Sequence, residues 1–197
     1  MNKNWSLAIV VAFALGLGAK VFLDEQSDLS PNASPSISAT LQGAGGEAVN
    51  IFDPQDPRVR VVYFGFTRCA DVCPTSLAML AGALNELDEA QISHFRPMFI
   101  SLDPERDAPD LAATYAGYFH ATIEGLSAPL SVTKPLADTY GVIFRKTELK
   151  DSALEYTLDH SSYFYFLTPD GSLITKVPHT LSPTPIIEAM KTIIKDQ

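Results

Sequence analysis

The chain has 197 residues, a hydrophobic content of 46% and a formal net charge of −9. This length accommodates one domain of ordinary size with additional segments, and the apolar content excludes a globally disordered chain. The acidic balance excludes the nucleic-acid-binding class, because the basic residues occur singly or in isolated pairs such as Arg145-Lys146 and form no basic patch.

The first segment, residues 1–23, predicts a membrane anchor. After Lys3, the 19 residues from Trp5 to Leu23 are largely apolar and carry no charge apart from Lys20. At about 1.5 Å per residue they span roughly 28 Å, close to the ~30 Å hydrocarbon core of a bilayer. We therefore expect a single-pass protein of the bacterial inner membrane. Because acidic residues follow the apolar stretch and Lys3 precedes it, the rest of the chain is expected to face the periplasm. A cleaved signal peptide is the alternative interpretation.

Residues 24–38 are acidic at first and then rich in Ser, Pro, Asn and Ala. This composition predicts a flexible linker without a core of its own. The folded domain is therefore expected over residues 39–197.

Hydrophobic periodicity in this domain predicts strands and helices in alternation. The predicted strands are 60–66, 95–102, 122–126, 163–167 and 172–177. The predicted helices are one opened by Pro74, then 110–119, 134–140 and a last one after Ser182. Strands and helices alternate first, and a hairpin and a helix close the chain, which is the pattern of an α/β fold.

The two cysteines, Cys69 and Cys73, stand between the predicted buried strand 60–66 and the helix opened by Pro74. The free N–H groups and the positive dipole end of a helix N-terminus favour thiolate over thiol. A disulfide closing so short a loop would contribute about 2 kcal/mol, against ~3 for a 15-residue loop. A purely structural bridge is therefore a weak interpretation.

The charges beside the cysteines act in opposite directions. Arg68 favours the thiolate of Cys69, Asp71 opposes it, and for both the alternative is a solvated loop charge. Three residues separate the cysteines, whereas redox sites of the thioredoxin type have two between them. The longer spacing permits both sulfurs to converge on one metal atom but does not require it.

Three segments together resemble the Sco/SenC family of copper chaperones. They are 63–74 (YFGFTRCADVCP), 101–107 (SLDPERD) and 158–161 (LDHS), and their order and spacing agree with the family pattern. The resemblance covers the chain from about residue 40 to its end. It implies a thioredoxin-like fold, with a central mixed sheet flanked by helices and preceded by a membrane anchor. It also implies that Cys69, Cys73 and His160 are copper ligands.

The function implied by this resemblance is that of a copper-binding metallochaperone that assists assembly of the copper centre of cytochrome c oxidase. The implied cofactor is copper, as Cu(I) or Cu(II). The implied partners are the copper-bearing oxidase subunit or another copper chaperone. Two thiolates and one imidazole suit copper, whereas structural zinc sites have four protein ligands. A three-ligand site leaves one side open for transfer of the metal.

Two other functions stay open at this point. The chain could be a thiol–disulfide oxidoreductase that reduces a partner with Cys69 and Cys73, or a tethered scaffold in which they form a structural disulfide. His160 separates the first alternative from copper binding, because thiol exchange needs only two sulfurs. The neighbouring Asp159 either orients the imidazole or makes a solvent or loop contact, since adjacent strand residues point to opposite faces.

The other residues with chemically capable side chains are predicted to be structural. Surface or capping roles are expected for His94, His120 and His179. Core packing is expected for Met79 and Met98. A loop network after a strand is expected for Asp103, Arg106 and Asp107.

Overall fold

The computed structural model describes residues 39–196. The predicted anchor at 1–23 and linker at 24–38 lie outside these residues. Within residues 39–196, no helix combines the length and the apolar character needed to cross a membrane.

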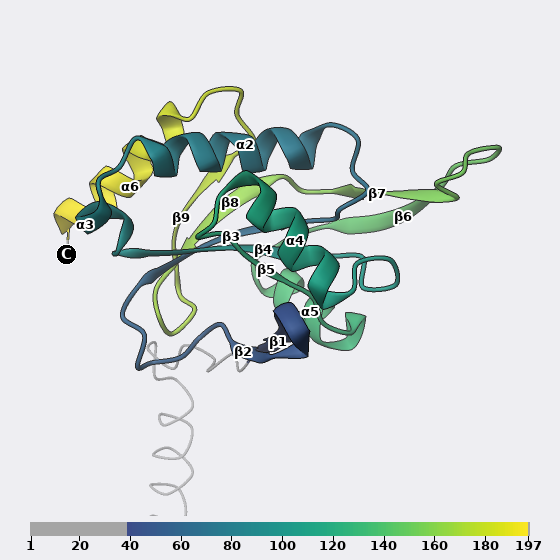
Figure 1. Ribbon diagram of the computed structural model, residues 1–197, viewed down its shortest axis with the longest axis horizontal. Coiled ribbons are helices and arrows are strands. Elements are labelled where there is room, and N and C mark those ends of the chain that lie inside the picture. The colour runs from purple at the N-terminus through teal and green to yellow at the C-terminus, as the bar shows by residue number, and fades with distance from the viewer. Residues whose placement is uncertain (1–38, 197) are drawn as a thin grey trace, which may run out of the picture. The chain divides into compact units, whose positions relative to one another are not determined.

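A five-stranded mixed sheet forms the centre of the domain, in the order β5-β4-β3-β8-β9 (Figure 1). Its strands are β3 (Val59–Gly65), β4 (Phe95–Ser101), β5 (Glu124–Leu126), β8 (Tyr163–Leu167) and β9 (Leu173–Pro178). β3, β4 and β5 are parallel, whereas β8 runs antiparallel to both β3 and β9. All seven residues of the central strand β3 are buried. The prediction of a thioredoxin-like α/β fold with a mixed sheet is confirmed.

Helices flank both faces of this sheet. They are α2 (Val72–Asn85), α3 (Glu89–Ile92), α4 (Pro109–Phe119), α5 (Leu130–Thr139) and α6 (Thr184–Asp196). α2 packs against both α4 and α6. In β3, Gly65 faces Cys73 of α2, whereas the Phe64 ring lies 6.5 Å from the ring of Tyr140, which follows α5. Because neighbouring strand residues point to opposite faces, α2 and the end of α5 cover different faces.

Two small hairpins were not predicted from the sequence. The first consists of β1 (Thr40–Gln42), the 3-10 helix η1 (Ala44–Gly46) and β2 (Ala48–Asn50). The second, which we call the β6–β7 hairpin, consists of β6 (Phe144–Glu148) and β7 (Tyr156–His160) and projects from the body of the domain (Figure 1). It forms a two-stranded sheet separate from the central one.

Two helices begin earlier than predicted. α2 starts at Val72 rather than at Pro74, which brings Cys73 into its first turn. α5 starts at Leu130 rather than at Lys134, so Pro135 lies inside the helix. Because proline is common in the first turn of a helix, Pro74 and Pro135 led to predicted starts that are later than the observed ones. The additional turn is stabilised by Thr133, whose Oγ1 donates a hydrogen bond to the carbonyl of Ala128.

Gly125 allows α4 to lie directly against β5. A Cβ at Gly125 would come within 2.0 Å of the carbonyl oxygen of Ala112 in α4, whereas a Cβ at Gly117, also in α4, would meet no atom within 4 Å. We expect Gly125→Ala to lower the free energy of unfolding by about 1–3 kcal/mol through overpacking. Gly117→Ala should raise it by up to about 1 kcal/mol, because alanine has the higher helix propensity. Urea unfolding followed by circular dichroism measures both, and an unchanged stability of Gly125→Ala would contradict the close contact.

Candidate metal centre

The two cysteines occupy the junction between β3 and α2, as the sequence predicted. Cys69 lies in the cysteine loop (residues 66–71) and is partly exposed, whereas Cys73 lies in the first turn of α2 and is fully buried. Both are free thiols. Gly65, at the end of β3, leaves space for the buried thiol, because a Cβ there would stand 3.0 Å from Cys73 Sγ.

His160 reaches the cysteines from the β6–β7 hairpin. It is the last residue of β7, 87 positions after Cys73, and its Nε2 lies 3.4 Å from Cys73 Sγ. The rings of Tyr63 and Phe66 meet the imidazole edge-on, at centroid distances of 6.3 and 5.9 Å. His160 Nδ1 lies 3.0 Å from the carbonyl oxygen of Ser161. A carbonyl can only accept, so we assign a proton to Nδ1, and Nε2 is the ring nitrogen that faces the cysteines.

The two thiols have opposite acid–base properties. A hydrogen bond from the Cys73 thiol is the main cause that lowers the pKa of Cys69 to about 3. Burial opposes this shift, and His160 and the backbone N–H groups of Cys73 and Asp71 add to it. The hydrogen bond to Cys69 and burial raise the pKa of Cys73. Cys69 is therefore a thiolate at neutral pH, while Cys73 keeps its proton.

This asymmetry predicts an unusual pH dependence of alkylation. Because the lowered pKa keeps Cys69 ionised, the metal-free reduced protein should react with iodoacetamide at a rate that changes by less than about threefold between pH 5 and pH 8. A thiol of ordinary pKa would change by roughly several hundredfold over this range. Peptide mass spectrometry should find Cys69 modified first and the buried Cys73 last. A rate that rises about tenfold per pH unit would contradict the assignment.

The charged residues next to the candidate ligands are Arg68 and Asp71 beside the cysteines and Asp159 beside His160. Arg68 and Asp71 are both exposed, and Asp71 influences the pKa of Cys69 through its backbone N–H. Asp159 accepts hydrogen bonds from Thr147 Oγ1 at 2.7 Å and from Arg145 Nε at 3.2 Å. It makes a surface contact, and the imidazole is oriented instead by the carbonyl of Ser161. Of the two interpretations of Asp159, the orienting role is not the one observed; its side chain is exposed and contacts the neighbouring strand β6 rather than a loop.

The residues predicted to be structural have structural contacts. His120 lies 2.8 Å from Thr122 Oγ1, His179 Nδ1 lies 2.8 Å from Ser76 Oγ, and His94 is exposed. Met98 is buried, and Met79 packs against the core. Asp103, Arg106 and Asp107 form the predicted loop network. Sequence reasoning missed the aromatic contacts to His160, although Tyr63 and Phe66 belong to the recognised motif.

The donor set fits copper. Thiolate sulfur and imidazole nitrogen are soft to borderline ligands. Bonds of about 2.0 Å to nitrogen and 2.3 Å to sulfur would separate the two donor atoms by ~3.7 Å at a trigonal angle. The 3.4 Å between Cys73 Sγ and His160 Nε2 is close to this value. In residues 39–196, no three His, Cys, Asp or Glu side chains are already grouped as a bound metal requires. We therefore expect the Cys69 side chain to shift when a metal binds.

Comparisons with known proteins agree on one family. The family model described as SCO1/SenC matches residues 40–195. The chain is 38% identical over 188 residues to Protein SCO1 homolog 1, mitochondrial, of Arabidopsis thaliana, covering 87% of this chain and 55% of that protein. It is 29% identical over 196 residues to the SCO2-like protein of Rickettsia felis, covering 94% of this chain and 95% of that protein. The chain thus spans about half of the plant relative and nearly all of the bacterial one.

A solved structure extends this likeness. The crystal structure of Arabidopsis thaliana ScoI with copper bound superposes with a TM-score of 0.73 at 29% identity, covering 81% of this chain and 98% of that chain.

Proposed function

The chain belongs to the SCO1/SenC family, and on that premise we propose that it binds copper through Cys69, Cys73 and His160 and assists assembly of cytochrome c oxidase. The observation that carries the proposal is the 3.4 Å contact between Cys73 Sγ and His160 Nε2, which brings together residues 87 positions apart. Copper-bound structures of similar proteins support the choice of metal.

Each ligand has a distinct part in this function. Cys69 is a thiolate accessible from solvent, so it is the donor that an incoming copper ion meets first. Cys73 is buried and must lose its proton when the metal binds. His160 supplies a neutral nitrogen donor. Copper is the cargo, and a site with three protein donors leaves one side for a ligand of the recipient protein.

The surface beside His160 suits the approach of a recipient. A hollow of about 370 Å³ is lined by Ile143, Arg145, Asp159, His160 and Ser161. Ile143, at the rim of this hollow, is 77% exposed and offers an apolar contact to a recipient. We infer that the recipient is the copper-bearing subunit of cytochrome c oxidase or another copper chaperone.

The proposed location follows from the sequence alone. Residues 1–23 would anchor the chain in the bacterial inner membrane, residues 24–38 would act as a linker, and the domain at 39–197 would face the periplasm. The support for this is the apolar stretch from Trp5 to Leu23 that follows Lys3.

One observation favours thiol–disulfide exchange as a second candidate function. Cys69 is an accessible thiolate, and Cys73 is a buried, protonated neighbour. In such a reaction the Cys69 thiolate attacks a disulfide of the partner and releases one partner thiolate. Cys73 then loses its proton and attacks the mixed disulfide, which leaves the partner as a dithiol and this chain with a Cys69–Cys73 disulfide.

A complementation experiment tests the copper function in cells. In cells that lack this chain, we expect the parent protein to restore cytochrome c oxidase, measured by its haem absorption and oxygen uptake. Cys69→Ser and Cys73→Ser should each reduce the restored oxidase by at least about tenfold, because each removes a thiolate donor. His94→Ala, an exposed change, should behave like the parent. Full restoration by Cys69→Ser would contradict the proposed function.

A further inference from the structure

We propose that residues 102–108, the loop between β4 and α4, form a brace that fixes the two halves of the candidate metal centre relative to each other. These halves are the cysteine loop and the β6–β7 hairpin. We call this segment the brace loop. Asp107 holds the cysteine loop, and Arg106 together with Asp103 holds the hairpin that carries His160. The inference rests on the proposed function, because it concerns the same ligands.

The cysteine side of the brace is the buried carboxylate of Asp107. Asp107 Oδ2 accepts hydrogen bonds from Thr67 N at 2.9 Å and from Ser101 Oγ at 2.7 Å. Asp107 Oδ1 accepts a third from Thr67 Oγ1 at 2.5 Å. Thr67 stands two residues before Cys69 in the cysteine loop. Three hydrogen bonds converge on this fully buried side chain, so they fix the start of the cysteine loop.

The histidine side of the brace grips Tyr156, which begins the strand that His160 ends. Arg106 Nη1 donates to the carbonyl oxygens of Tyr156 at 2.9 Å and Leu154 at 3.0 Å. The Arg106 guanidinium also lies 3.5 Å from the centroid of the Tyr156 ring. Tyr156 OH donates to Asp103 Oδ1 at 2.7 Å, and Asp103 Oδ2 accepts from Arg106 Nε at 2.5 Å.

These contacts matter because the β6–β7 hairpin forms its own two-stranded sheet and makes no ladder with the central one. At its inner end, the hairpin continues directly into β8. Farther out, its described attachments to the brace loop are the Tyr156 contacts, the hydrogen bond from Arg106 to the Leu154 carbonyl, and the ion pair of 2.7 Å between Lys146 and Glu105. Because β7 is held near both of its ends, it places His160 at a defined distance from Cys73.

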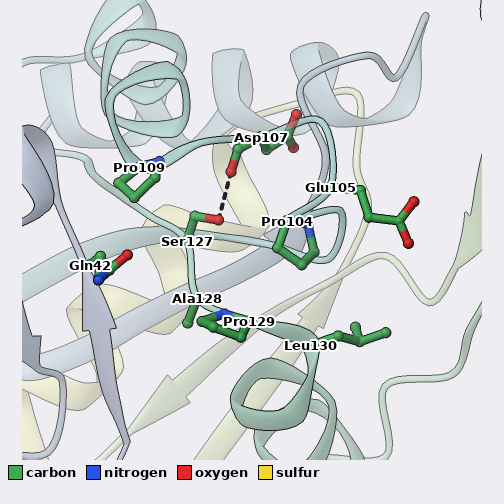
Figure 2. A pocket seen from close by; sticks show the side chains of 9 residues that line it. All are labelled: Gln42, Pro104, Glu105, Asp107, Pro109, Ser127, Ala128, Pro129 and Leu130. Atoms are coloured by element: carbon green, nitrogen blue, oxygen red, sulfur yellow. Dashed lines mark hydrogen bonds between the residues drawn. The ribbon is translucent and has the colours of Figure 1, made fainter.

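The brace loop is itself held in one shape. The backbone N–H groups of Arg106 and Asp107 donate to the carbonyl of Asp103 at 3.1 and 2.8 Å. Ser127 Oγ donates to the Asp107 carbonyl at 2.6 Å, and both residues line a hollow of about 390 Å³ (Figure 2). Because the loop is fixed in this way, it can hold the cysteine loop and the hairpin relative to each other.

Arg106→Gln tests the histidine side. Two thiolates alone can hold copper(I), whereas copper(II) depends more on the imidazole. We therefore expect about 10–100-fold weaker copper(II) binding and an altered spin-resonance signal, with copper(I) affinity changed by less than about threefold. The matched control is Arg96→Gln. Arg96 is 11% exposed, as Arg106 is 10% exposed, and it pairs with Glu124 at 2.7 Å without touching either half of the centre.

Thr67→Val tests the cysteine side, and it keeps the buried carboxylate of Asp107 in place. Because it removes one hydrogen bond next to Cys69, we expect it to weaken copper(I) and copper(II) binding by a similar factor, about 3–10-fold. A variant that weakens copper(II) alone would contradict this half of the brace.

A double-mutant cycle with His160→Ala separates positioning from general stability. If Arg106 acts through His160, then Arg106→Gln has no further effect on copper(II) binding once His160 is alanine. Additive losses, or an Arg106→Gln protein that behaves like Arg96→Gln, would overturn the brace. An unchanged copper(II) affinity of His160→Ala would instead refute the proposed function.

A measurement without metal distinguishes failure of the brace proposal from failure of the proposed copper function. The ¹⁵N and ¹H signals of the His160 imidazole in the reduced, metal-free chain should shift or broaden in Arg106→Gln and stay at the parent positions in Arg96→Gln. Unchanged imidazole signals in Arg106→Gln would overturn the brace whatever the copper result.

Discussion

Replacing His160 with alanine is expected to weaken copper(II) binding by at least about 100-fold, because changes around a metal ligand alone typically cost 10–100-fold. The imidazole is one of the three proposed donors, and its Nε2 faces the buried thiol of Cys73. Copper(I) binding should fall less, since two thiolates can hold copper(I) in a linear arrangement. The copper(II)–thiolate absorption and the spin-resonance signal report the loss directly, and competition titrations give the affinities.

Two controls make this result specific. His120→Ala changes an imidazole that contacts Thr122 and lies outside the candidate centre, so it should keep the parent spectrum. The His160→Ala domain should remain folded, and its two cysteines should still form a disulfide. If His160→Ala kept the copper(II) spectrum and supported normal oxidase assembly, thiol–disulfide exchange would replace copper delivery as the better hypothesis.

Oxidation of Cys69 and Cys73 to a disulfide is expected to abolish copper(I) binding, because a disulfide offers no thiolate donor. Because Cys69 is an accessible thiolate, this oxidation should proceed readily under mild conditions. Copper(I) stoichiometry, measured against a coloured chelator before and after reduction, should change from about none to about one per chain, as a single three-donor site predicts.

The matched variant for this experiment is Cys73→Ser, which cannot form the intramolecular bridge. Its residual copper(I) binding should be insensitive to the same mild oxidant, provided that intermolecular disulfides are excluded by gel filtration. Equal copper(I) uptake by the oxidised and reduced parent would show that the cysteines are not the metal donors.

The central strands were predictable because their residues are apolar on both faces. The run 60–66 predicted β3 to within one residue, and 163–167 coincides with β8. The β6–β7 hairpin was not predictable in this way, because Phe144–Glu148 is mostly polar and largely exposed. Its attachment depends on contacts between Tyr156 and Arg106, which are far apart in the chain and leave no local periodic signal.

The candidate site was predictable only in part. The strand–cysteine–helix order indicated ionised thiols, but the ligand role of His160 came from the resemblance to a family. That Cys69 is the ionised thiol and Cys73 the protonated one depends first on the hydrogen bond between them and then on the deeper burial of Cys73, which a spacing of four residues does not encode. The link from Asp107 to Thr67 spans 40 positions, so only the folded chain reveals it.

The order of strands in the central sheet also governs how the protein can mature. β3 lies between β4 and β8, and Tyr63 pairs with Phe164. A chain that emerges from its N-terminus presents both thiols long before β8 and His160 are available to cover them. Long-range strand pairing is slow, so in an oxidising compartment folding competes with disulfide formation. If the domain faces the periplasm, as proposed, we expect newly exported molecules to form the Cys69–Cys73 disulfide before folding is finished, and a cellular reductant would then set the fraction of them that can carry copper.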